Sequence, residues 1–172
     1  ALANGASVAH VTVSATGERA GNVPLEDTVM ALKILYGIDV GIRTEELYGL
    51  SKLVQKLAGL ELPPNRPIVG DSLYHIESGI VSMFHRRCKD VEPLEYIPFL
   101  PEVVGRPGVD IALGKGSGLA NIEEHLERLG IEVSADQAKA ILDVVKQTSI
   151  ERKALLAPEE FEGIVRSVMA PA

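Results

Sequence analysis

The chain has 172 residues, of which 46% are hydrophobic and 24% charged, and its formal net charge is −7 at pH 7. This length can bury a hydrophobic core, and the composition is typical of a globular protein. The acidic balance disfavours a nucleic-acid partner. No apolar run reaches transmembrane length, and no signal peptide is visible, so we expect no membrane association. The single cysteine, Cys88, excludes a disulfide framework and a multi-cysteine zinc site, and it favours a reducing, cytoplasmic location.

The amino-terminal residues predict a strand, a polar loop and a helix. Residues 1–5 (ALANG) resemble the last turn of a helix, so we expect a longer polypeptide or one subunit of a split enzyme. Residues 7–14 (SVAHVTVS) form a β-branched run typical of a strand buried on both faces. The glycine loop, residues 16–22 (TGERAGN), follows, and a helix is expected from Pro24 to Tyr36. Such a loop is either a polar site at the end of a strand or a plain connector with a solvated Glu-Arg pair.

The rest of the chain reads as helices separated by irregular segments. A helix capped by Thr44 is expected to end at Gly59. The proline-rich segment 62–67 forbids regular structure and predicts a domain boundary. Further helices are expected over residues 83–89, 119–129, 134–151 and 157–168, with a short strand over 109–113.

Four segments together resemble one family. Residues 17–27 (GERAGNVPLED) are similar to the GERAGN-x-x-LE motif of the isopropylmalate synthase and homocitrate synthase family. Residues 69–80, 96–106 and 113–118 are similar, in the same order, to its VG…HESGIH, Y-E-P…PELVGR and LGKHSG segments. The family consists of metal-dependent TIM-barrel enzymes related to hydroxymethylglutaryl-CoA lyase. The resemblance spans almost the whole chain.

The resemblance implies an α/β fold, in which the end of a TIM (β/α)8 barrel precedes mainly helical carboxyl-terminal subdomains. Residues 1–39 would form the last barrel strand and helix, residues 40–107 a linker and first small subdomain, and residues 108–172 an α-rich second subdomain. Subdomains of this family reach over the barrel of a partner. A homodimer is therefore implied, or a partner chain that carries the rest of the barrel.

The implied reaction is a condensation of acetyl-CoA with a 2-oxo acid on a divalent cation, Mg²⁺, Mn²⁺ or Zn²⁺. Asn22 matches a residue at or beside the metal, whose main ligands would precede Ala1. Glu18 is either an acid/base group or the ion-pair partner of Arg19, and Arg19 would hold a substrate carboxylate or the loop geometry. Tyr96 falls on the catalytic tyrosine, with packing among prolines as the alternative.

The chain departs from the family pattern at its histidines. Ile76 and Val81 replace the two histidines of HESGIH, and Gly116 replaces that of LGKHSG. His75 is the preferred catalytic substitute and His85 the less favoured one, and either could be an ordinary partly exposed histidine. The departures suggest a divergent synthase, a carbon-carbon lyase or aldolase on the same scaffold, or an accessory subunit of a split enzyme.

Residues 85–89 (HRRCK) read as a solvated helix face or as a contact for the phosphates of coenzyme A. Residues 114–117 (GKGS) resemble a phosphate loop only superficially, because Gly108 lies one residue too far from Gly114 and Gly116 occupies the Ser/Thr position of that motif.

Overall fold

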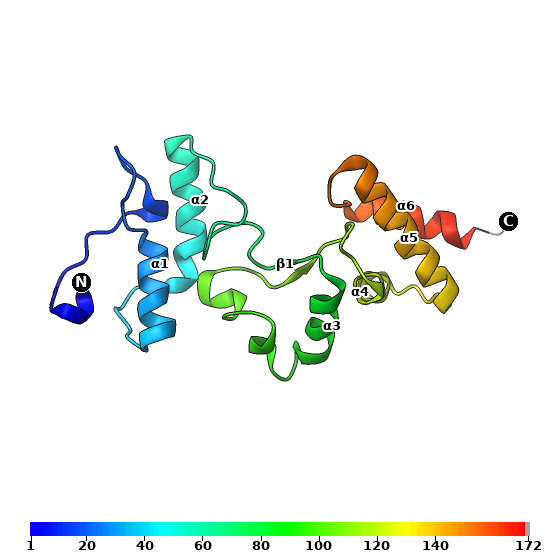
Figure 1. Ribbon diagram of the computed structural model, residues 1–172, viewed down its shortest axis with the longest axis horizontal. Coiled ribbons are helices and arrows are strands. Elements are labelled where there is room, and N and C mark those ends of the chain that lie inside the picture. Colours follow the sequence, from blue (N-terminus) through cyan, green and yellow to red (C-terminus); the bar gives the residue numbers. More distant parts are fainter. Residues whose placement is uncertain (171–172) are drawn as a thin grey trace. The chain divides into compact units, whose positions relative to one another are not determined.

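The computed structural model describes residues 1–170, and these residues are mostly helical, with a single two-stranded sheet (Figure 1). They divide into two compact units. Unit 1 contains Ala1–Tyr74 and Phe99–Gly108, and unit 2 contains His75–Pro98 together with the chain from Val109 onward.

Two helices and a short turn form the frame of unit 1. Helix α1 (Leu25–Met30) continues into a π-helical turn, Ala31–Leu35, and both lie within the helix expected from Pro24 to Tyr36. Helix α2 (Leu47–Ala58) follows a 3₁₀ turn, Thr44–Glu46. It ends where expected, at Gly59, whose φ of 62° is the left-handed conformation that glycine favours. Both helices pack on the 3₁₀ turn Val13–Ala15, which leads into the glycine loop.

The core of unit 1 joins segments that are distant in the sequence. Its buried apolar residues are Val29, Met30, Leu47, Val69, Tyr74, Phe99 and Val104. The Tyr74 hydroxyl donates a hydrogen bond to the Phe99 carbonyl at 3.2 Å, and the two rings meet edge to face. Burial raises the pKa of Tyr74, so its hydroxyl stays protonated as a donor. The segment 62–67 contains no helix or strand, as its prolines predict.

The expected strand over residues 7–14 is wrong for this structure. A single parallel bridge joins Thr12 to Pro24, and Val8 is 80% exposed. A strand exists only through pairing with neighbours, whereas the sheet in residues 1–170 lies elsewhere, in unit 2.

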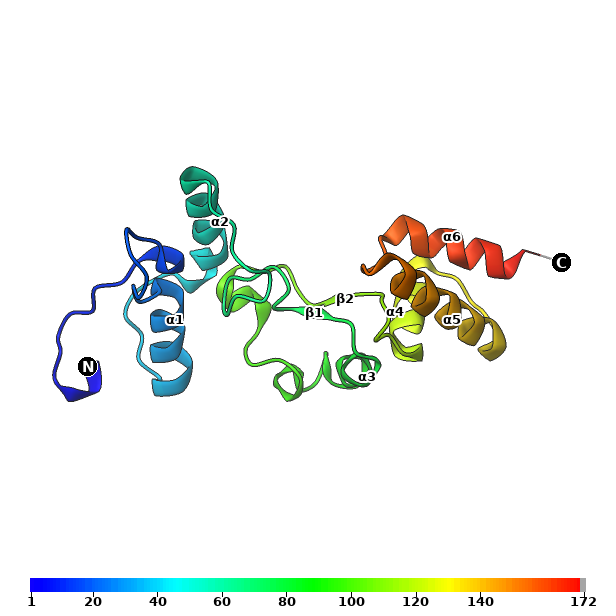
Figure 2. The ribbon, with the colours of Figure 1, turned by 45° about the horizontal axis from the view of Figure 1, so that its top comes forward.

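Unit 2 combines the small sheet with four helices. Strand β1 (His75–Ile76) pairs in parallel with β2 (Asp110–Ile111), which lies inside the strand expected over 109–113. The helices are α3 (Gly79–Cys88), α4 (Leu119–Leu129), α5 (Ala135–Arg152) and α6 (Pro158–Met169). Helix α3 packs on α4, α4 on α5, and α5 on α6 (Figure 2).

Local signals place the last three helices close to their expected bounds. Ser134 and Gln137 form the predicted capping box, because each side chain accepts the backbone N–H of the other residue. The apolar faces meet in one cluster, whose buried members are Leu113, Ile122, Leu126, Ile141, Val145, Phe161 and Val165. Helix α3 begins four residues earlier than expected, at Gly79 instead of 83.

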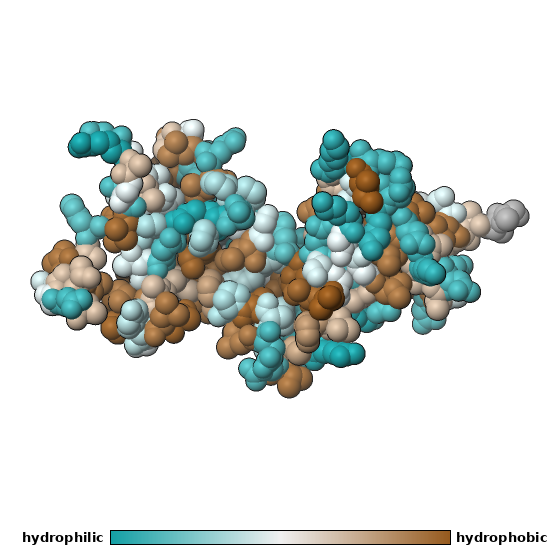
Figure 3. Space-filling model, in the orientation of Figure 1, coloured by the Kyte–Doolittle hydropathy of each residue, from teal (hydrophilic) through white to brown (hydrophobic). Residues whose placement is uncertain are grey.

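Unit 1 also exposes an apolar surface. Val8, Leu35 and Tyr36 are 80%, 76% and 66% exposed. Figure 3, in the orientation of Figure 1, shows hydrophobic side chains gathered over the lower part of the α1 region. Parts of residues 1–11 and of the α1 region line a hollow of about 580 Å³ there. Exposed apolar patches of this kind mark interaction surfaces. None of the helices in residues 1–170 has both the length and the apolar character needed to cross a membrane.

Candidate functional site

Asn22 and two glycines shape the glycine loop. The Asn22 side-chain amide donates hydrogen bonds to the carbonyls of Thr16, at 3.4 Å, and Arg19, at 3.2 Å. A Cβ atom at Gly17 would lie 2.0 Å from the Asn22 nitrogen, so a larger residue there would displace the Asn22 side chain. Gly21 has a φ of 98°, which also favours glycine. The loop is therefore folded around the Asn22 side chain.

Glu18 and Arg19 contact each other in the loop. Arg19 Nε lies 3.5 Å from Glu18 Oε1, and both side chains are more than 85% exposed. A pair this exposed contributes little to stability. Both side chains are therefore available to a ligand that would approach the loop.

A buried carboxylate anchors the base of the loop. Glu26 is 1% exposed, and its Oε2 accepts the backbone N–H of Ser14 at 2.9 Å. Ser14 has a φ of 55°, and its hydroxyl meets that of Ser51 at 2.7 Å. Arg66 lies 3.6 Å from Glu26 Oε1 and donates to Asp27 at 2.9 Å. This anchoring role was not predicted, although Glu26 is the glutamate of the GERAGN-x-x-LE motif.

The described residues can supply one ligand, the Asn22 side-chain oxygen, to a divalent cation. Asn22 uses its nitrogen for both loop hydrogen bonds, and its Oδ1 is a ligand suited to a hard cation. Among residues 1–170, no three or more His, Cys, Asp or Glu side chains gather in a way that could hold a metal ion. A complete site would take its other ligands from outside these residues.

The Val-Gly-Arg segment that the sequence analysis compared with PELVGR has a structural role in unit 1. Arg106 stacks over the ring of Tyr48, with 4.3 Å between the guanidinium carbon and the ring centroid, and donates to the Asp71 carbonyl at 2.9 Å. Hydrogen bonds from Lys52 and Tyr48 lower the pKa of Asp71. A Cβ atom at Gly105 would lie 2.1 Å from the Glu45 carbonyl, so the backbones approach closely.

In unit 2, the segment similar to HESGIH contacts the segment similar to LGKHSG. Glu77 Oε1 accepts the Gly116 N–H at 2.7 Å, and Gly79 N–H donates to the Gly116 carbonyl at 3.2 Å. The amide of Asn121, which is fully buried, donates to the carbonyls of Glu77 and Ala112. A Cβ atom at Gly116 would lie 3.2 Å from Glu77 Oε1. The loop over residues 114–118 is therefore held through its backbone.

His75, the preferred catalytic histidine, lies on β1 and pairs with Asp110 across the sheet. Its Nε2 is 3.8 Å from Asp110 Oδ2, and its side chain is 34% exposed. Ile76 beside it is buried. The structure thus brings His75 to an aspartate on the neighbouring strand, whereas Tyr96 pairs with a different histidine.

Tyr96 pairs with His85. The Tyr96 hydroxyl lies 3.0 Å from His85 Nδ1, and the two rings meet edge to face with centroids 5.2 Å apart. His85 is 7% exposed, whereas the tyrosine is only partly buried. Burial raises the pKa of Tyr96 and lowers that of His85, so both groups are neutral near pH 7.

His75 was the favoured histidine in the sequence, whereas the structure places His85 in contact with Tyr96, a contact that helical spacing could have indicated. His85 lies four residues after Val81, and both are on α3, so they share one face of the helix. His85 therefore stands one turn beyond the position at which the family has its second histidine.

Ion pairs between α3 and α4 surround His85. Arg86 contacts Glu123 and Glu127, and also Glu124, at 3.3 Å. Glu124, which is 6% exposed, also pairs with Lys89 at 3.5 Å and with Arg128 at 3.4 Å. The basic cluster of residues 85–89 is therefore largely paired with α4.

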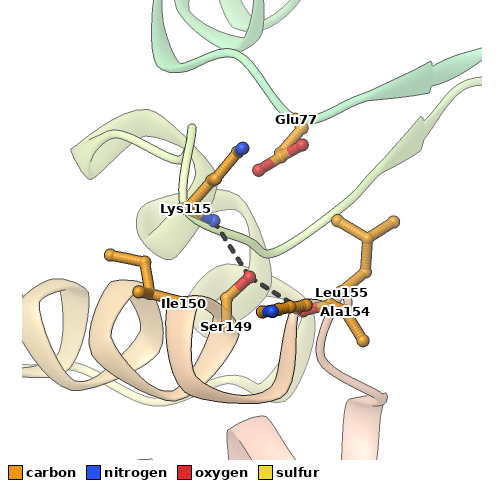
Figure 4. A pocket seen from close by; sticks show the side chains of 7 residues that line it. Glu77, Lys115, Ser149, Ile150, Ala154 and Leu155 are labelled. Atoms are coloured by element: carbon orange, nitrogen blue, oxygen red, sulfur yellow. Dashed lines mark hydrogen bonds between the residues drawn. The ribbon is translucent and has the colours of Figure 1, made fainter.

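A pocket of about 630 Å³ opens beside the 114–118 loop (Figure 4). Lys115 N–H donates to Ser149 Oγ at 3.1 Å, and that hydroxyl donates to the Ala154 carbonyl at 2.8 Å. In Figure 4 the side chains of Lys115 and Glu77 extend toward one another. The lining of the pocket also includes Lys153, so it presents one carboxylate and two ammonium groups.

Two family models match the chain. Residues 1–54 match the HMGL-like model, and residues 68–153 match a model described as homocitrate synthase post-HMGL domain-like. The first contains the glycine loop, and the second contains His85 and Tyr96.

Individual relatives match most of the chain. It is 42% identical over 170 residues to the homocitrate synthase AksA of Methanothermobacter thermautotrophicus, an alignment that covers 99% of the chain and 42% of that protein. Over 147 residues it is 50% identical to a Methanoculleus marisnigri protein named "Putative (R)-citramalate synthase CimA". Over 147 residues it is also 48% identical to a Methanopyrus kandleri protein named "Probable 2-isopropylmalate synthase". These two alignments each cover 86% of the chain and 28% of the relative. The chain therefore spans less than half the length of these relatives.

Proposed function

The chain belongs to the homocitrate synthase family of HMGL-like proteins, and from that premise we propose that it forms part of an enzyme that condenses acetyl-CoA with a 2-oxo acid. The observation that carries this proposal is the Tyr96 hydroxyl, held 3.0 Å from His85 inside the segment that matches the post-HMGL domain. A neutral phenol in such a pair can give or receive a proton.

The reaction requires a proton to leave the methyl group of acetyl-CoA, after which the enolate attacks the ketone of the 2-oxo acid. Hydrolysis of the thioester by water then releases coenzyme A and a 2-hydroxy dicarboxylate or tricarboxylate. We assign Tyr96 to proton transfer and Arg19 to the carboxylate of the 2-oxo acid. Glu18, which contacts Arg19, would orient that guanidinium or serve as an acid/base group.

We further propose that Asn22 supplies one oxygen ligand to a divalent cation. When bound, such a cation supplies Lewis-acid polarisation of the ketone. The hydrogen bonds from Asn22 to the loop carbonyls at positions 16 and 19 would orient its amide for this contact.

The exposed apolar surface of unit 1 supports a place at the end of a barrel. We propose that the preceding barrel units cover Val8, Leu35 and Tyr36 in the complete enzyme, where residues 7–14 would pair as a strand. The domain boundaries after residues 39 and 107, and the homodimer, remain predictions that accompany this proposal. Size-exclusion chromatography with light scattering would test the dimer.

Thiol release from acetyl-CoA by the complete enzyme tests the proposal. Pyruvate, 2-oxoisovalerate and 2-oxoglutarate would be offered separately, with and without Mg²⁺, Mn²⁺ or Zn²⁺. We expect metal-dependent thiol release with at least one acceptor. No release with any acceptor, combined with cleavage of a hydroxyacyl-CoA, would refute the synthase and assign a carbon-carbon lyase.

A further inference from the structure

His85 is a buried titratable group that the family pattern does not use. The family pattern places histidines where this chain has Ile76 and Val81, and valine cannot move protons. Ile76 is buried in β1, and its carbonyl accepts the N–H of Ala112, so its position is structural. Neither of those two positions therefore carries a side chain that could transfer a proton.

The geometry points to His85 as the replacement. Its imidazole stands one helical turn beyond Val81 on the same face of α3 and contacts the Tyr96 hydroxyl at 3.0 Å. Resting on the proposed function, we propose that His85 is the positioning residue that holds Tyr96 and accepts its phenolic proton during deprotonation of acetyl-CoA.

The proton transfers balance along this pair. The methyl C–H bond of acetyl-CoA breaks, its proton passes to Tyr96 Oη, and its electron pair remains on the enolate. The phenolic O–H bond of Tyr96 breaks at the same time, and that proton passes to His85 Nδ1. The acceptor role requires the neutral tautomer of His85 that carries its proton on Nε2.

The surroundings of His85 keep its ring neutral near pH 7. Burial lowers the pKa of His85, Glu124 partly offsets this, and the cations Lys89 and Arg128 lower the pKa further. Asp90, just beyond α3, acts in the same direction as Glu124. The imidazole is therefore available as a proton acceptor.

The test compares two substitutions of His85 in the complete enzyme. Glutamine can keep a hydrogen bond to the Tyr96 hydroxyl but cannot accept its proton, whereas leucine can do neither. We expect both H85Q and H85L to lower kcat by about 100-fold with little change in KM. The wild-type kcat should decrease at acidic pH, where the imidazole becomes protonated. Because the pKa of His85 is lowered, this acidic limb should lie below the range of an ordinary histidine, and both variants should lose it. H85Q with wild-type kcat and an unchanged pH profile would overturn the inference.

Two further comparisons separate His85 from its competitor and from the proposed function. Loss of the acidic limb in H75Q, with H85Q unaffected, would assign the role to His75 and overturn the inference. ¹⁵N-NMR of the histidine rings should show that Y96F shifts the resonances of His85, and an unshifted ring would overturn the pairing. Turnover that does not depend on His85 would refute only this inference, whereas no turnover with any acceptor would refute the proposed function as well.

Discussion

Replacement of Asn121 by alanine should destabilise unit 2 substantially. Asn121 is fully buried, its Oδ1 accepts the Gly118 N–H at 2.9 Å, and its Nδ2 donates to the carbonyls of Glu77 at 3.0 Å and Ala112 at 3.2 Å. The substitution removes all three bonds and leaves the Ala112 carbonyl buried, and the Glu77 and Gly118 backbone groups partly buried, without this partner. At about 1 kcal/mol per bond, the loss is about 3 kcal/mol, or roughly 12–24 °C in Tm for a unit of fewer than about 100 residues.

Thermal and urea unfolding, followed by far-UV circular dichroism, measure this loss. Asn22→Ala is the matched control, because it removes the same side chain from an exposed loop, where its hydrogen bonds are 3.2 and 3.4 Å long. We expect less than about 1 kcal/mol for the control. An Asn121→Ala variant no less stable than Asn22→Ala would refute the reasoning that the buried amide links the 77–79 and 112–118 segments.

Three other substitutions test the packing, the proposed chemistry and the titration. Gly79→Ala should lower the free energy of unfolding by about 1–3 kcal/mol, because its Cβ atom would lie 2.7 Å from the Gly118 backbone. Gly163→Ala, whose Cβ atom would meet open space on α6, should raise the free energy of unfolding by about 0.5–1 kcal/mol. Equal urea midpoints for the two variants would contradict this prediction. Tyr96→Phe should lower kcat by about 10²–10⁴-fold and leave the circular dichroism spectrum unchanged, and wild-type turnover in the variant would exclude the phenol from catalysis. Burial lowers the pKa of His85, so the unfolded chain binds the proton more tightly, and the wild type should lose stability as pH falls below about 6.5. The His85→Gln variant should lose less stability than the wild type between about pH 8 and pH 5.5. Equal losses in the two proteins would show that the His85 ring does not contribute.

The candidate site was predictable where a motif marks a loop and unpredictable where two segments must meet. The motif indicated Asn22 and the glycine loop, and the structure shows how the Asn22 amide folds that loop. It did not indicate that Glu26 is buried beneath the loop, because the backbone of Ser14 and the side chain of Arg66 come from other segments. The contact of His85 with Tyr96 was not predicted for the same reason, since it joins α3 to a residue eleven positions further along the chain.

The sequence by itself determined most of the helices, because their signals are local. Apolar spacing and the capping pair Ser134 and Gln137 act within a few residues, and the helices α4, α5 and α6 form close to their expected bounds. Only the tertiary structure decided the strands and the side-chain pairs, since both depend on partners distant in the sequence. Residues 7–14 have strand propensity but no neighbouring strand in the described chain, whereas β1 and β2, two residues each, form because the fold brings them together. The pairing of His85 with Tyr96 likewise exists only because α3 and the segment after it fold back on each other.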